Sequence, residues 1–352
     1  MQRWYTRIFS IETNFIIRNI KLFLMQKRLK VENLQGGARR VFLLDMPEYG
    51  NMGDQAIALA MRRFLEKYLP ECEIIEIEED VFPQYIRWLK KNVNGEDVIC
   101  LTGGGNMGTM YQRYEAIRRI VIRMFRNNRI FIFPQTVTDK ADSLYSKIEW
   151  KRAQKVYCKA ENLIIMAREQ STYDFLKSRL TCNVIAVPDI AFFLKNSLTV
   201  NENRTDVVGI CFREDGERTL LAEDKERIIN TFSKIEEFDT VLTGHRRITY
   251  ENRQEEVISM LQSFAEYSLV VTDRLHGLIF SYLTNTPCIV ESSKTGKVES
   301  TVAFLNVSMS TEMEIGKPIS YSEGLRCELS KKFEILGQKM RGIVYGSNEE
   351  IH

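Results

Sequence analysis

The chain is poor in histidine and has no long apolar run. Only three histidines occur among 352 residues, and no two of them have the spacing of metal ligands. A zinc site is therefore not expected. No stretch approaches the roughly 18 consecutive apolar residues that a membrane-spanning helix needs. We expect a protein without a metal or spanning helix that stays on the cytoplasmic side of the membrane.

Several familiar signatures are also missing. The seven cysteines include no C-x-x-C pair, and most lie in apolar runs, which is typical of buried thiols in a reducing compartment. No G-x-G-x-x-G occurs, so a dinucleotide cofactor is not indicated. The net charge of +2 neither favours nor excludes a polyanionic partner, and no nucleic-acid partner is expected.

The N-terminal residues 1–30 alternate basic and apolar side chains, without the apolar core or cleavage site of a secretory signal. A second basic stretch is predicted on or just after a helix. Its arginines are Arg113, Arg118, Arg119, Arg123, Arg126 and Arg129. Such a run is either a solvated helix face or, with the N-terminus, a patch for anionic lipid or a lipid-linked diphosphate. The second reading predicts peripheral contact with the inner face of the membrane.

Short β-rich runs alternate with helical patterns along the chain, which is typical of parallel sheets covered by helices. The first set of runs is 40–46, 73–78, 97–101, 129–134, 163–167 and 183–188. After a polar linker at 195–204, the second set is 206–212, 238–244, 267–273 and 286–291. Helices are predicted over 55–69 and from about 322 to 341. The pattern predicts an α/β protein with two Rossmann-like domains facing each other across a cleft.

We divide the chain accordingly into four predicted parts. They are a basic amphipathic segment (1–35), an N-terminal Rossmann-like acceptor-side domain (36–195), a C-terminal Rossmann-like donor-side domain (205–320), and a C-terminal helix with its tail (321–352).

Four candidate segments follow strands of the first set, where ligands bind in open α/β sheets. YGNMGD (49–54) opens a helix that Asp54 could cap, and TGGGNMG (102–108) could present backbone N–H groups to an anion or a sugar. Both segments could equally be structural turns. Arg168 in AREQS follows the fifth run, as an anion ligand or a surface salt bridge. Asp189 in PDIAFF is predicted to be a turn or helix cap.

The segment TDRLHG (272–277) is the most informative. It ends a strand and opens a helix, so Arg274 and His276 could point towards one pocket near a positively polarised helix N-terminus. Histidine exchanges protons near neutral pH, which suits acid–base catalysis. We interpret Asp273 as a helix cap and His245 as a loop residue. Lys294 and Lys297 follow the next strand and could bring a cation to the same cleft.

In their order, GNMGD, GGGNMG, PQT, ARE-x-S, PD-x-AF, TDRLHG and a downstream G-K-V resemble the polysaccharide pyruvyl transferase family over about residues 42–300. The resemblance implies a two-domain fold like that of glycosyltransferases of the B type. It implies phosphoenolpyruvate as donor, no cofactor, and a sugar acceptor that receives pyruvate as a cyclic ketal in exopolysaccharide, capsule or cell-wall polymer synthesis. A lipid-linked oligosaccharide is one such acceptor.

The resemblance also implies roles for individual residues. The implied catalytic residues are His276, Arg168 and Lys297, and the implied donor-binding residues are Arg274, Leu275 and Lys294. The implied acceptor-binding residues are Asn51, Gly53, Asp54, Gly103, Gly104, Gly105 and Asn106. Ala167 stands where serine is frequent in the family, and the lysine spacing differs slightly, so Lys294 competes with Lys297 for the cleft.

Two other functions fit the same pattern. A glycosyltransferase with a nucleotide-sugar donor could use this architecture, although no ribose-binding glutamate is clearly placed in the second domain. A non-catalytic scaffold of a polysaccharide assembly complex would use the basic N-terminus and the arginine-rich helix as contacts. The strand-end Arg168, Arg274 and His276 argue against the scaffold.

Overall fold

The structure is a computed structural model that describes residues 10–29, 39–139, 143–198, 203–213, 221–244, 247–292, 296–309 and 311–346. The chain divides into two compact units. Unit 1 comprises Met1–Glu48, Phe64–Asp189 and Gln338–His352, and unit 2 comprises Tyr49–Arg63 and Ile190–Gly337. Residues 49–63 and the C-terminal helix are therefore assigned differently from the predicted ranges.

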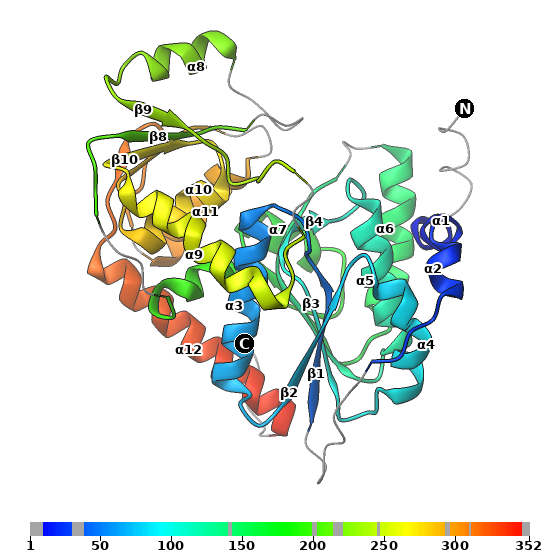
Figure 1. Ribbon diagram of the computed structural model, residues 1–352. Helices are drawn as coiled ribbons and strands as arrows, with labels where there is room; N and C mark the ends of the chain where they lie inside the picture. The colour runs from blue at the N-terminus through cyan, green and yellow to red at the C-terminus, as the bar shows by residue number, and fades with distance from the viewer. Residues whose placement is uncertain are drawn as a thin grey trace, which may run out of the picture. The chain divides into compact units, whose positions relative to one another are not determined.

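Unit 1 is built on a seven-stranded parallel sheet (Figure 1). Its strands are β1 (Arg40–Met46), β2 (Glu73–Glu78), β3 (Val98–Leu101), β4 (Gly104–Met107), β5 (Arg129–Val137), β6 (Leu163–Ala167) and β7 (Asn183–Ala186). Six of them follow the order β2-β1-β3-β5-β6-β7, and β4 pairs with the end of β5. The six predicted strands are confirmed within a few residues at their ends, and β4 was not predicted.

Both faces of this sheet are covered, which explains its continuous apolar strands. The helices within unit 1 are α1 (Ile11–Arg18), α2 (Ile20–Leu24), α4 (Phe82–Asn92), α5 (Gln112–Met124), α6 (Leu144–Tyr157) and α7 (Gln170–Lys177). Phe42 and Leu44 of β1 enter a core cluster with residues of α1, α4, α5, α6 and α7. On the other face, the ring of Phe133 packs edge-on against Phe64 of α3 (Met52–Tyr68) at 6.1 Å.

Unit 2 contains a five-stranded sheet in the order β12-β11-β10-β8-β9, in which only β12 is antiparallel. The strands are β8 (Val208–Cys211), β9 (Ile235–Glu237), β10 (Leu269–Thr272), β11 (Cys288–Val290) and β12 (Pro318–Ile319). The prediction of a strand at 238–244 is wrong. The ladder there is formed by 235–237, and only Val241 makes an isolated bridge, to Asn51.

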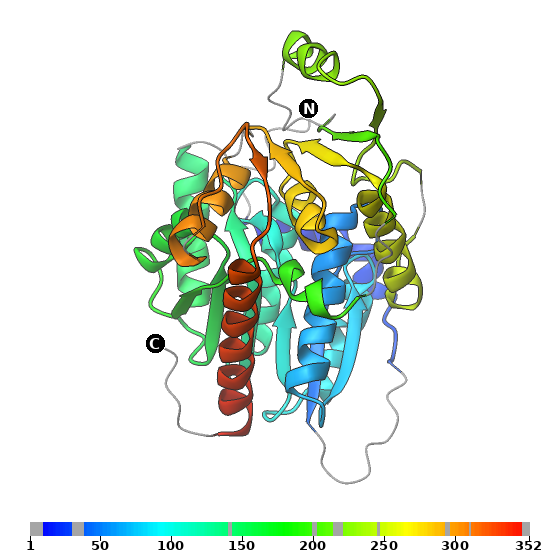
Figure 2. The same cartoon turned by 90° about the vertical axis from the view of Figure 1, so that its left-hand side faces the viewer.

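The helices of unit 2 are η2 (Ile190–Asn196), α8 (Ala222–Ile229), α9 (Tyr250–Glu266), α10 (Leu275–Thr284) and α11 (Lys297–Met309). An ion pair of 2.8 Å joins Lys225 of α8 to Glu237 of the edge strand β9. Figure 2 shows α8 as the yellow-green helix that precedes β9 in the chain. The predicted C-terminal helix is confirmed as α12 (Glu323–Tyr345), and its residues are shared between the two units.

The arginine-rich helix is not an open cationic patch. Arg118 and Arg119 of α5 are only 1% exposed, and both bind the buried Glu115. Arg119 also reaches Glu149 of α6 at 2.7 Å and Glu12 of α1 at 3.5 Å. The expectation that this run offers its arginines to anionic lipid is therefore wrong for its two central members, which hold helices together instead.

Candidate active site

The segment 272–277 makes a tight strand-to-helix turn in unit 2. The Thr272 hydroxyl donates to the carbonyl of Cys211 at 2.7 Å and accepts from the backbone N–H of Arg274 at 3.0 Å. A Cβ on Gly277 would lie only 2.8 Å from Cγ2 of Thr272. Glycine is therefore needed for α10 to start this close to β10, and the turn fixes where Arg274 and His276 emerge.

Asp273 does not cap α10, contrary to the prediction. The N-cap residue is Arg274, and no side chain caps the helix. The Asp273 carboxylate instead accepts from the backbone N–H of Arg213, after β8, at 2.9 Å. Burial raises the pKa of Asp273, and the N–H of Arg213 opposes that shift. Asp273 thus ties the ends of β8 and β10 together.

Arg274 is buried and oriented by a carboxylate of its own unit. Its Nη2 binds Oδ2 of Asp239 at 2.6 Å, and Asp239 is 26% exposed in its side chain. A guanidinium held from one side by a carboxylate has a fixed plane, which suits recognition of a second, planar anion. Asp239 was not singled out in the sequence, because nothing local to FDTVLTG links it to a residue 35 positions away.

His276 lies at the first turn of α10 and packs against the first turn of α3. A Cβ on Gly53 would lie 2.7 Å from Cε1 of the imidazole, and closer still to Nδ1 and Cγ. The Gly53 N–H donates to the Asn51 side chain at 3.0 Å, which holds this turn. Two motifs more than 200 residues apart therefore form one constellation within unit 2.

The beginning of α3 is anchored to unit 2 by several bonds. The N–H of Met52 donates to the carbonyl of Thr240 at 2.8 Å, and the guanidinium of Arg253 donates to the side chain of Gln55 at 2.9 Å. Asp54 lies in the first turn of α3, where its carboxylate accepts from the Tyr49 hydroxyl at 2.9 Å. The bonds to Thr240 and Arg253 explain why residues 49–63 group with the second sheet.

Neither candidate lysine has a described side chain. Lys294 lies outside the described residues, as does His245. Lys297 is the first residue of α11, and the structure describes its backbone but not its side chain. The choice between Lys294 and Lys297 stays a prediction.

Arg168 follows β6 in unit 1 and is not a surface salt bridge. It is 3% exposed, and its Nη1 binds Oδ2 of Asp189 at 2.6 Å. Its Nε donates to the hydroxyl of Thr136 at 2.7 Å, which in turn donates to Glu169. Burial raises the pKa of Glu169, while Arg168 opposes that shift. Asp189, which was predicted to be a turn or helix cap, is therefore the ion-pair partner of Arg168.

The glycine-rich segment 102–108 forms the short strand β4 where a loop was expected. The carbonyl of Thr102 accepts from the side chain of Gln135 at 2.6 Å, and the carbonyl of Gly105 accepts from Thr138 at 3.0 Å. Asn106 accepts from the buried Arg118 at 2.8 Å. Gly104 has a φ of 129°, a conformation that favours glycine.

Asp45, near the carboxyl end of β1, is a buried residue that was not singled out from the sequence. It lies at a register shift near the end of β1, with a φ of 65°, and is 2% exposed. Within the described part of the chain, its Oδ1 has no hydrogen-bond partner. Burial raises the pKa of Asp45 well above its usual value, and Glu79 adds to the shift, while Arg118 and Arg113 oppose it.

The described part of the chain lacks two further features. No three His, Cys, Asp or Glu side chains there gather as a metal site would require. No helix in those ranges combines the length and apolar character needed to cross a bilayer.

Comparison with known proteins decides the family. A family model described as polysaccharide pyruvyl transferase matches residues 51–295, from the start of α3 to beyond the end of β11. The chain belongs to the polysaccharide pyruvyl transferase family. The match confirms the resemblance drawn from the motifs, and it identifies the protein as a transferase of polysaccharide biosynthesis.

Individual relatives are similar over about three quarters of the chain. The transferase is 34% identical over 280 residues to "General stress protein 30" of Bacillus subtilis (strain 168), covering 76% of this chain and 78% of the relative. It is 27% identical over 279 residues to "Pyruvyl transferase 1" of Schizosaccharomyces pombe, covering 74% of this chain and 68% of the relative.

A crystal structure of an uncharacterised protein from Klebsiella pneumoniae subsp. pneumoniae NTUH-K2044 is similar in fold. Its TM-score is 0.52 at 21% identity, covering 84% of this chain and 95% of that one. The predicted α/β class is confirmed.

Proposed function

We propose that this transferase moves the pyruvyl group of phosphoenolpyruvate onto two hydroxyls of a sugar, forming a cyclic ketal in a surface polysaccharide or its precursor. The observation that carries the proposal is the turn at 272–277 in unit 2. It brings a carboxylate-oriented guanidinium, Arg274, and an imidazole, His276, to the start of one helix. A doubly anionic donor and a proton transfer require these two kinds of group.

In the proposed reaction, His276 donates a proton to the C3 methylene of phosphoenolpyruvate, which becomes the methyl group, and C2 gains oxocarbenium character. One sugar hydroxyl adds to C2 and loses its proton to the imidazole. The C2–O bond to phosphate then breaks, and the second hydroxyl closes the ketal. Inorganic phosphate leaves with the second hydroxyl proton, so donor and diol are converted to ketal and phosphate without an oxidant or reductant.

We propose roles in the same reaction for the other candidate residues. Arg274, Leu275 and Lys294 bind the donor, while Arg168 and Lys297 take part in catalysis. The acceptor is proposed to contact Asn51, Gly53, Asp54, Gly103, Gly104, Gly105 and Asn106. No metal or redox cofactor enters the scheme, so a chelator should leave the rate unchanged. A lipid-linked oligosaccharide is included among the proposed acceptors.

Donor binding can be tested without knowing the acceptor. A ligand that binds only the folded protein stabilises it by about 2.7 kcal/mol at 100 times its Kd. Phosphoenolpyruvate should therefore raise the melting temperature of the whole protein, and the rise should shrink in Arg274→Lys. Stabilisation by nucleotide sugars and not by phosphoenolpyruvate would replace the proposal with a glycosyltransferase.

The role of His276 needs a second test. His276→Ala should still gain stability from phosphoenolpyruvate but should form no ketal, because binding and proton transfer are assigned to different side chains. His245→Ala is the matched control, since it removes an imidazole from a segment to which no role is assigned. Ordinary ketal formation by His276→Ala would exclude His276 as the proton donor.

A further inference from the structure

Three helices of unit 1, namely α1, α2 and α6, carry an unusual share of exposed apolar side chains. Thirteen large hydrophobic residues are exposed in the described part of the chain, and seven of them lie on these helices or just after α2. These seven are Ile16, Ile17, Ile20, Leu24, Met25, Leu144 and Ile148. We call these seven residues, together with the exposed charged residues of α1, α2, α6 and residues 25–29, the outer face of unit 1.

The three helices are held together, so the outer face is one surface. Arg119 of α5 binds Glu12 of α1 and Glu149 of α6. The side chain of Gln26, after α2, accepts from the backbone N–H of Arg87 in α4 at 3.1 Å. Ile11 and Phe15 of α1 are buried in the core of unit 1, so the remaining apolar residues of α1 face away from it. Figure 1 shows α1 and α2 alongside α5 and α6.

The exposed charges of the outer face all have one sign. They are Arg18, Lys21, Lys27, Arg28, Lys147, Lys151 and Lys155. Lys147, Lys151 and Lys155 recur every fourth residue, which places them in one row along α6. Within residues 10–29 and 143–158, which cover α1, α2 and α6, the only acidic residues are Glu12 and Glu149, and both are buried against Arg119. This concentration contrasts with the net charge of +2 for the whole chain.

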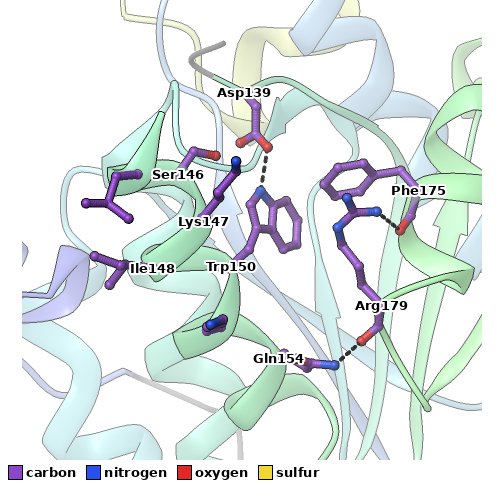
Figure 3. A pocket seen from close by; sticks show the side chains of 10 residues that line it. Asp139, Ser146, Lys147, Ile148, Trp150, Gln154, Phe175 and Arg179 are labelled. Atoms are coloured by element: carbon purple, nitrogen blue, oxygen red, sulfur yellow. Dashed lines mark hydrogen bonds between the residues drawn. The ribbon is translucent and has the colours of Figure 1, made fainter. Parts of the chain in front are cut away.

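A cavity of about 570 Å³ opens on the same surface (Figure 3). Its walls include Leu144 and Ile148 of the outer face, together with the edge-on pair Trp150 and Phe175, whose ring centroids are 4.9 Å apart. Lys147, Lys151 and Arg179 line it as well, and its one carboxylate, Asp139, accepts from the indole N–H of Trp150 at 2.5 Å. An apolar hollow lined with cations suits an amphiphile with an anionic head.

We propose that the outer face of unit 1 binds the surface of a bilayer that contains anionic phospholipid. The exposed apolar side chains would enter the headgroup region, and the surrounding lysines and arginines would bind lipid phosphates. A second copy of the chain fits less well, because a symmetric contact would bring each row of cations against itself. The inference does not depend on the proposed reaction, since none of its residues is assigned to donor, acceptor or catalysis.

Vesicle flotation with the full chain tests the proposal. The protein should float with vesicles of phosphatidylcholine and phosphatidylglycerol but not with phosphatidylcholine alone, and salt should weaken the binding. Each basic residue near such a surface contributes about fivefold to partitioning. Lys21→Glu/Lys151→Glu/Lys155→Glu should therefore weaken binding by on the order of 100-fold or more. Ile17→Ser/Ile20→Ser/Leu24→Ser should weaken it as well.

Matched controls come from unit 2, where the same changes should leave flotation unaltered. Lys317→Glu removes an exposed charge, and Val307→Ser and Ile335→Ser remove apolar side chains that are 86% and 51% exposed. Wild-type protein that stays unbound with anionic vesicles would overturn the proposal, as would equal binding by the outer-face variants. A soluble dimer that the serine variant abolishes would show that a second copy covers this face instead. Ketal formation measured in parallel without lipid separates a lost membrane contact from a lost reaction.

Discussion

The packing of His276 against Gly53 makes a quantitative prediction for Gly53→Ala. The added Cβ would lie 2.7 Å from Cε1 of the imidazole and nearer to two other ring atoms. Ordinary separations are about 3.5 Å, so the ring must retreat by about 1 Å or more. Misplacing a catalytic group by 1 Å can cost about 100-fold in rate, which corresponds to about 2.7 kcal/mol of transition-state stabilisation. We therefore expect kcat/KM for ketal formation to fall by about that factor.

The assay is phosphate release from phosphoenolpyruvate that depends on a sugar acceptor. Gly324→Ala is the matched control, because Gly324 is also the second residue of its helix and the nearest atom to its added Cβ is 3.7 Å away. Gly53→Ala should still gain stability from phosphoenolpyruvate, because donor binding is assigned to Arg274 and not to the imidazole. Activity of Gly53→Ala within a factor of three of wild type would refute this placement of a catalytic imidazole.

Three further predictions concern buried charges. Arg119→Met should destabilise the protein by about 3 kcal/mol in denaturant unfolding, because the buried Glu115 and Glu149 lose a shared buried cation and keep Arg118 and Arg152, respectively. Arg341→Met, which removes a solvent-exposed surface pair with Glu71, should cost far less; equal losses would contradict the buried network. Asp45→Asn should raise the melting temperature at neutral pH. The folded-state pKa of Asp45 is raised, so ionisation destabilises the fold above the unfolded pKa, and the gain should vanish as the pH falls below about 4. Arg274→Lys should weaken phosphoenolpyruvate binding about 10-fold to 100-fold in calorimetry, because it loses the planar fork while keeping the charge.

Much of the fold could be predicted because its signals are local. The interior strands β1, β3, β5 and β6 of unit 1 are rich in apolar residues, as in LIIMA at β6, and a strand buried on both faces leaves that mark in the sequence. The strand at 238–244 was misplaced because FDTVLTG has the composition of a strand, whereas the pairing edge of β8 is occupied by 235–237. Helix α12 was predicted from its periodicity, within a few residues of its ends.

The partners of the site residues could not be predicted, because they come from distant parts of the chain. Arg168 and Arg274 were identified by their positions at strand ends, but Asp189 and Asp239, which orient them, were not linked to them. The arginines of α5 look like a solvated face in the sequence, because their acidic partners lie on α1 and α6 as well as on α5. The positive φ of Asp45 likewise has no signal in LLDM.

The central claim is ketal-forming pyruvyl transfer that depends on His276, and product analysis tests it most directly. Wild-type protein is incubated with phosphoenolpyruvate carrying a ¹³C label at C2 and a panel of surface-polysaccharide sugars, and the products are followed by ¹³C NMR. We predict a new ketal carbon and one phosphate released per ketal, with neither formed by His276→Ala. Nucleotide-sugar consumption with no labelled ketal on any sugar, or undiminished ketal formation by His276→Ala, would contradict the claim.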